Sequence, residues 1–144
     1  MGASPSGGED GSRSRVSDVR YMLDTTFVID YLRNDAAAVE RFERFFTDGD
    51  DVFVNEIVIC EASTGARIHP DPGLMAMLDP LEFVQPGPDA PHRAGEWRTD
   101  ARRRGLVLSL ADALIAAAAE AADATVLTRN VRDFALTPVR VEPY

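Results

Sequence analysis

The feature that most limits the fold of this 144-residue chain is a regular exchange between short apolar runs and helical patterns, which begins at Tyr21. Such an exchange is typical of strands joined by crossover helices, and it therefore favours a mostly parallel sheet. The expected strands are 20–23, 52–54, 81–84, 125–127 and 139–141. The expected helices are 26–33, 36–46, 56–66, 74–78, 90–104 and 110–122. The sequence thus predicts an α/β domain.

Two of the expected helices have faces that can be assigned. In 36–46, apolar side chains recur at helical spacing and predict one buried face, formed by Val39, Phe42, Phe45 and Phe46. Helix 110–122 is almost entirely apolar or alanine, which predicts central packing against the sheet.

Residues 1–20 differ in composition from the rest of the chain. They are rich in glycine, serine and charged residues, which offer little apolar surface to bury. We therefore expect a flexible tail at 1–20 and a single domain at 21–144. There is no run of 18 apolar residues, so no membrane span is expected.

The balance of acidic and basic residues excludes several kinds of binding and catalysis. Asp and Glu number 24 against 15 basic residues, a net charge of −9, and every base is arginine. Such an acidic chain is a poor candidate for broad, nonspecific nucleic-acid binding, but a small arginine patch and a metal ion can still hold a nucleic-acid substrate. Without lysine there is no Schiff base, no P-loop lysine and no lysine-dependent phosphoacceptor site.

The single cysteine, Cys60, excludes an internal disulfide framework and a zinc site built on several thiolates. We interpret it as a small core residue rather than a nucleophile. This use of cysteine is typical of a reducing, cytoplasmic setting.

Several polar residues stand where a strand ends or a helix begins. Asp24 follows the first strand, Asn130 follows the strand 125–127, and Asp112 opens the helix 110–122. Each has a purely structural interpretation as a helix cap, and Ser109 to Asp112 has the spacing of a capping box.

Glu61 is harder to explain by local structure. Ile57, Val58 and Ile59 precede it on the expected helix, and no arginine lies one helical turn away. Because an ionised carboxylate on a buried face is costly unless it is paired or binds a metal, a cation or a distant partner is indicated.

The joint pattern favours a metal site. In an open α/β sheet the ends of parallel strands share one edge, and ligands bind there. Asp24, Asp112 and Asn130 would meet at that edge, and Glu61 can reach it from its helix. Carboxylate and amide oxygens suit Mg²⁺, with Mn²⁺ as an alternative.

Four blocks of the sequence resemble PIN-domain proteins, especially the VapC-type toxins of bacterial toxin–antitoxin pairs. The blocks are MLDTTFVIDYL at 22–32, VNEIVICEASTGA at 54–66, LADALIAA at 110–117 and LTRNVRDF at 127–134. Each block alone is loose, but their order across the chain is specific. The second block places the family's glutamate at Glu61 rather than at Glu56.

The resemblance implies a PIN-like three-layer α/β/α sandwich and a Mg²⁺-dependent endoribonuclease that acts as a toxin. It also implies that Asp24, Glu61 and Asp112 hold the metal, while Asn130 or Asp133 completes the site. Many relatives have a fourth aspartate where this chain has Asn130, which keeps open a catalytically weak or inactive protein that only binds RNA or a partner. The implied partners are an RNA substrate, a VapB-type antitoxin and a second copy of the chain in a homodimer.

A dense group of arginines falls in the helix 90–104. Arg98 and Arg102 share one helical face, and Arg103 lies beside them in the sequence. They are candidates for contacts with RNA phosphates, while the alternative is a solvated face whose basic end suits the helix dipole.

Overall fold

The structure of the protein is a computed structural model that describes residues 19–144. The expected tail at 1–20 therefore lies outside the described residues except for its last two positions, and Arg20 already begins the first strand.

The described residues form one parallel sheet of five strands, in the order β4-β3-β2-β5-β6. Their bounds are β2 Arg20–Leu23, β3 Asp51–Val54, β4 Glu82–Phe83, β5 Thr125–Leu127 and β6 Val141–Glu142. In the central strand β2, Met22 pairs with Phe53 on one side and Val126 on the other. Met22 and Leu23 are fully buried, as a strand covered on both faces requires.

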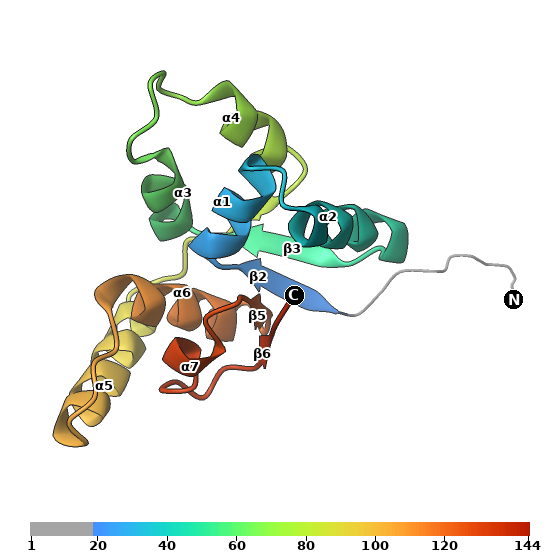
Figure 1. Ribbon diagram of the computed structural model, residues 1–144. Coiled ribbons are helices and arrows are strands. Elements are labelled where there is room, and N and C mark those ends of the chain that lie inside the picture. Colours follow the sequence, from blue (N-terminus) through green and yellow to red (C-terminus); the bar gives the residue numbers. More distant parts are fainter. Residues whose placement is uncertain (1–18) are drawn as a thin grey trace, which may run out of the picture.

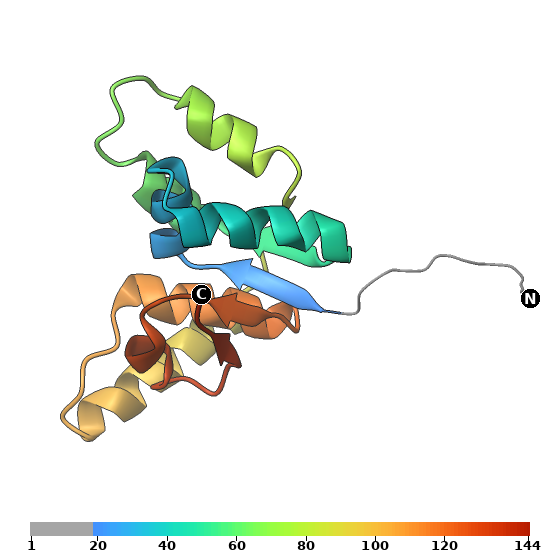
Figure 2. The same cartoon turned by 45° about the vertical axis from the view of Figure 1, so that its right-hand side comes forward.

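The helices cover both faces of this sheet. Their bounds are α1 Thr25–Leu32, α2 Ala36–Asp48, α3 Glu56–Ser63, α4 Pro72–Leu78, α5 Asp89–Arg103, α6 Leu110–Ala121 and α7 Val131–Phe134. Figures 1 and 2 show α1 and α2 on one side of β2, and α5 and α6 on the other. The predicted three-layer α/β/α architecture with a parallel sheet is confirmed.

Helix α6 packs in the centre of the core. Ala113 and the run from Ile115 to Ala119 are buried, so the small side chains let this helix lie close to the sheet, as its composition predicts. Within residues 19–144, no helix combines the length and the apolar character that crossing a membrane requires.

The predicted buried face of α2 is partly wrong. Phe42 and Phe45 are buried, but Phe46 is 46% exposed and contacts the Phe42 ring edge-on. Arg41 takes a buried place on that face instead, with its guanidinium over the ring of Phe45 and that of Tyr21. The two aromatic rings offset the cost of burying the charge of Arg41. Helical spacing alone does not predict this burial, because it does not show which rings will lie beside the guanidinium.

Other differences concern boundaries. The last strand lies at Val141–Glu142 rather than 139–141, and α3 ends at Ser63 rather than at 66. The chain leaves the helix at Thr64, which is extended with φ of −64° and ψ of 125°, and Gly65 follows with φ of +87°. Helix α7 was not predicted. Cys60 is exposed, so its interpretation as a core residue is wrong.

Candidate active site

An open cavity of about 450 Å³ lies at the edge of the sheet where β2 and β5 end. Its lining comes from the start of α1, from α3, from α6 and from the turn after β5. The lining residues are Asp24, Thr25, Thr26, Ile29, Glu61, Thr64, Asp112 and Asn130. The fold therefore brings together Asp24, Glu61, Asp112 and Asn130.

Asp24 is the most constrained of these residues. It is the N-cap of α1, and its Oδ1 accepts a 2.8 Å hydrogen bond from the Thr25 backbone N–H. Its Oδ2 accepts from the hydroxyls of Thr26, at 2.9 Å, and Thr128, at 2.7 Å. Burial nevertheless raises the pKa of the Asp24 carboxyl, since its residue is only 2% exposed and the hydrogen bonds offset only part of the desolvation. Asp24 therefore both caps α1 and lines the cavity, so both interpretations are confirmed.

Glu61 lies on α3, and its Oε1 accepts a 2.5 Å hydrogen bond from the Thr25 hydroxyl. The expectation that it occupies a buried apolar face is wrong, because Glu61 is exposed. Val58 alone on α3 is fully inside the core, and the second half of this short helix turns its polar residues towards the cavity and solvent.

Asp112 occupies the first turn of α6, where its backbone N–H donates to the Ser109 hydroxyl at 3.0 Å. This is the predicted cap. Partial burial raises the pKa of the Asp112 carboxyl to about 6, helped by the negative charges of Asp24, Asp133 and Glu61. Burial is the largest cause of this raised pKa, and repulsion from the neighbouring acids adds to it.

Asn130 and Asp133 occupy different positions relative to the cavity. Asn130 lines it and precedes α7, but its side chain makes no capping hydrogen bond to that helix. Asp133 lies on α7 and does not line the cavity, although its charge acts on Asp112.

Thr128 is a site residue that the sequence reasoning missed. It is fully buried, and its hydroxyl donates to Asp24 while accepting a 2.9 Å hydrogen bond from the Asn130 backbone N–H. The only signal in the sequence is a hydroxyl residue directly after the buried strand end at Leu127. Its role depends on Asp24, which is 104 positions away in the chain.

The donor chemistry of the cavity fits a hard divalent cation. Carboxylate, amide and hydroxyl oxygens face it, and the residues that line it include no arginine or histidine. Across residues 19–144, however, no three acidic, histidine or cysteine side chains already stand at distances that would hold a metal ion. A cation in the cavity would therefore require the side chains of the exposed Glu61 and the half-buried Asp112 to move towards it.

The arginines of α5 lie outside this cavity. The Nε of Arg98 donates to the Leu108 carbonyl at 3.0 Å, so this side chain supports the loop that leads to α6. Arg102 and Arg103 are exposed in the last turn of α5, and Figure 1 shows this end of the helix projecting away from the sheet.

A fold of this kind, with acids gathered where parallel strands end, is shared by a known family. Residues 21–138 match the PIN domain family model, and the chain belongs to this family. The predicted resemblance is therefore confirmed.

The individual relatives agree with this assignment. Ribonuclease VapC19 of Mycobacterium tuberculosis is 29% identical over 123 residues, which cover 85% of this chain and 98% of the relative. Among solved structures, a toxin–antitoxin complex from Klebsiella pneumoniae contains a chain that is 26% identical, with a TM-score of 0.70 and coverage of 86% and 98%. VapBC2 from Rickettsia felis bound to a DNA fragment from their promoter has a TM-score of 0.72 at 23% identity, with coverage of 87% and 98%.

Proposed function

We propose that this PIN-domain protein is a divalent-metal-dependent endoribonuclease and the toxin of a VapBC-type pair. The family and the relative named ribonuclease VapC19 support the activity class. The observation that carries the proposal is the convergence of Asp24, Glu61, Asp112 and Asn130 on one open cavity.

Asp24, Glu61 and Asp112 are the proposed metal ligands, with Mg²⁺ as the cation and Mn²⁺ as an alternative. A bound cation supplies polarisation of the scissile phosphate, a lower pKa for an attacking water and stabilisation of the leaving oxygen. Asn130 faces the same cavity and is suited to orient water or complete the ligand set. Asp133 contributes negative charge from α7.

The chain itself supplies preorganisation. Three hydrogen bonds fix the carboxylate of Asp24, and the Thr25 hydroxyl holds Glu61 beside it. The Asp24 carboxylate is therefore already oriented and loses little freedom when a cation and a phosphate enter the cavity.

The proposed function is tested with purified protein and a labelled unstructured RNA, in Mg²⁺ and again in EDTA. We expect cleavage only with the metal. Glu61→Gln should lower the rate by more than about a hundredfold, because loss of a residue that merely supports a metal ligand already costs 10- to 100-fold.

The matched control for Glu61 is Glu56→Gln on the same helix. Glu56 lines a separate cavity of about 270 Å³, together with apolar residues such as Ile57 and Val84, so the rate should stay unchanged. An inactive Glu56 variant beside an active Glu61 variant would show that the second family block has been assigned to the wrong glutamate.

Arg102 and Arg103 are proposed to contact RNA phosphates. Replacing both with Ala should weaken RNA binding across sequences and flatten the dependence of log Kd on log salt by roughly one unit per lost contact. Arg44→Ala, on the exposed face of α2, is the control. An unchanged slope would assign the α5 arginines to a solvated helix end or to the antitoxin interface.

The partners proposed for the chain are a VapB-type antitoxin and a second copy of the chain. The Rickettsia felis and Klebsiella pneumoniae structures, which are toxin–antitoxin complexes, support the first of these. Growth arrest on expression, relieved by the cognate antitoxin, is the expected result.

A second candidate is a PIN-fold protein that binds RNA or a partner without cleaving it. Asn130 in place of an acid favours it, as does the spacing of the carboxylates across residues 19–144, where no three stand ready to hold a metal. RNA binding that persists in EDTA, with no cleavage in either Mg²⁺ or Mn²⁺, would select this alternative.

A further inference from the structure

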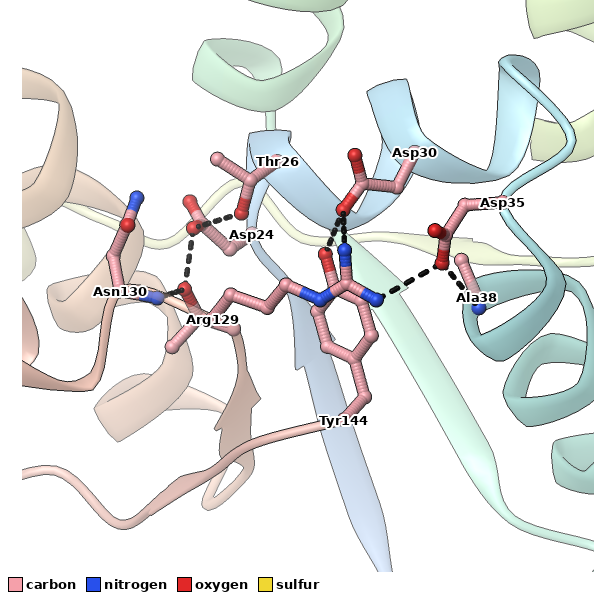
Figure 3. A network of polar contacts seen from close by, with 9 residues as sticks. Asp24, Thr26, Asp30, Asp35, Ala38, Arg129, Asn130 and Tyr144 are labelled. Atoms are coloured by element: carbon pink, nitrogen blue, oxygen red, sulfur yellow. Dashed lines mark hydrogen bonds and ion pairs between the residues drawn. The ribbon is translucent and has the colours of Figure 1, made fainter.

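Arg129 is the centre of a cluster of four side chains that lies beside the cavity (Figure 3). Its Nη1 lies 3.1 Å from Asp30 Oδ2, and its Nη2 lies 2.9 Å from Asp35 Oδ2. The ring of Tyr144 stacks on the guanidinium at 4.5 Å, and its hydroxyl donates to Asp30 Oδ2 at 2.5 Å. We call Arg129, Asp30, Asp35 and Tyr144 the Arg129 cluster.

The partners of Arg129 are held by separate elements. Asp30 belongs to α1, while Asp35 is the N-cap of α2 and accepts a 3.0 Å hydrogen bond from the Ala38 N–H. Tyr144 follows β6 and packs edge-on against the buried ring of Phe27, with 4.8 Å between centroids. The guanidinium is therefore clamped between α1, α2 and the segment after β6.

The segment after β6 is itself anchored at Glu142. The Glu142 carboxylate lies 3.2 Å from Nη2 of the buried Arg41, and its carbonyl accepts a 3.0 Å hydrogen bond from the Thr128 N–H. These contacts fix the place of Tyr144, because it is only two residues further along the chain.

Arg129 lies in the chain between two residues of the site. Thr128 donates to Asp24, and Asn130 lines the cavity. The Arg129 side chain runs the other way, towards Asp30 and Asp35, as Figure 3 shows. A restraint on this side chain is therefore a restraint on the turn that presents Thr128 and Asn130.

The cluster is poorly suited to bind a phosphate. Two carboxylates already occupy the fork of Arg129, so an RNA anion would have to displace them and meet their negative charge. Each ion pair is partly exposed and contributes little stability alone, so the arrangement matters through the geometry it enforces.

We propose that Tyr144 and Arg129 are positioning residues of the nuclease site, which hold the turn 128–130 against α1 and α2 and so keep Thr128 and Asn130 in place around Asp24. This inference rests on the proposed ribonuclease function. Neither residue touches the reacting atoms; both act through the turn.

The test compares Tyr144→Phe, which removes only the hydroxyl, with Tyr144→Ala, which also removes the stacked ring. Small displacements of catalytic groups lower the reaction rate. We therefore expect Tyr144→Ala to lower kcat about tenfold and to keep KM within about twofold of the wild-type value. The kcat of Tyr144→Phe should lie between those of Tyr144→Ala and the wild type. The control is Arg140→Ala, which removes the exposed Arg140–Asp123 pair at the starts of β5 and β6, away from the turn 128–130 at the ends of the strands.

A second readout does not depend on activity. The backbone N–H of Asn130 is bonded to the Thr128 hydroxyl, so Tyr144→Ala should raise its hydrogen-exchange rate by about tenfold, measured by NMR, with Val126 in β5 unchanged. Faster exchange throughout the core would overturn the proposal, because Tyr144 would then serve overall stability.

The remaining outcomes are equally decisive. An unchanged kcat in Tyr144→Ala would overturn the proposal. So would a raised KM with a flatter salt dependence in Arg129→Ala, which would make Arg129 a direct RNA contact. If wild-type protein cleaves no RNA, the proposed function fails, while the exchange rate of Asn130 still tests the positioning of the turn.

Discussion

Asp24→Asn should abolish metal-dependent RNA cleavage while the fold persists. The variant removes the negative charge that a cation needs, and more than about a hundredfold loss is expected because Asp24 is a proposed direct ligand. The fold should survive, because an asparagine oxygen still accepts the Thr25 N–H bond at the start of α1. Initial cleavage rates and far-UV circular dichroism of the two proteins measure both effects.

A matched control for Asp24 is Asp71→Asn. Asp71 is the N-cap of α4, and its Oδ1 accepts a 3.0 Å hydrogen bond from the Leu74 N–H, so the chemical change is the same away from the cavity. Full activity in this control, with none in Asp24→Asn, assigns the loss to the cavity. If Asp24→Asn kept wild-type activity, Asp24 would be only a helix cap.

Asp112→Asn should make the metal-free protein more stable and leave it inactive. Burial and the charges of Asp24, Asp133 and Glu61 raise the pKa of this carboxyl to about 6. Ionisation of Asp112 therefore destabilises the folded protein. Because the residue is half-buried and screened by solvent, a gain on the order of 1 kcal/mol in the free energy of unfolding is expected.

The gain should depend on pH in a defined direction. In the unfolded chain the Asp112 carboxyl has the ordinary aspartate pKa of 3.8, and in the folded protein its pKa is about 6. The wild type therefore loses stability as pH rises from about 3.8 to 6, and the full difference from Asp112→Asn is present above about 6. Below 3.8 both states of the wild type are protonated, and the difference should vanish.

The same measurement tests the shared metal site. Millimolar Mg²⁺ should raise the Tm of the wild type, because it binds the native state, and should raise that of Asp112→Asn much less. Asp89→Asn, in the first turn of α5, repeats the change at a helix start away from the cavity and should be neutral or slightly destabilising. A destabilised Asp112→Asn with a wild-type response to Mg²⁺ would make Asp112 a capping residue alone.

The positions of Asp24, Asp112 and Asn130 could be predicted because local and topological rules both apply to these three cavity residues. Asp24 directly follows the parallel strand β2, Asn130 lies in the turn after the parallel strand β5, and such strand ends share one edge. Asp112 opens the next helix along that edge. Their convergence follows from the order of the elements, whatever the details of packing.

The surroundings of Glu61 show where local patterns fail. Its apolar neighbours Ile57 and Ile59 predicted a buried carboxylate, yet both are only partly buried and Glu61 is exposed. Which face of a short helix is covered depends on the elements that pack against it, and periodicity over two turns leaves several answers.

Sequence by itself determined the element order, the parallel sheet, the family and the four polar residues at its edge. These depend on hydrophobic period, capping chemistry and strand order, which are properties of neighbouring residues. Tertiary structure alone decided that Thr128 holds Asp24, that Arg41 is buried between aromatic rings, and that Tyr144 clamps Arg129 onto Asp30. Thr128 and Asp24 are 104 positions apart, and Tyr144 and Asp30 are 114 apart. Contacts over such separations form only when the layers pack against each other. A local sequence pattern does not predict them, because it does not show which distant side chains will be buried together.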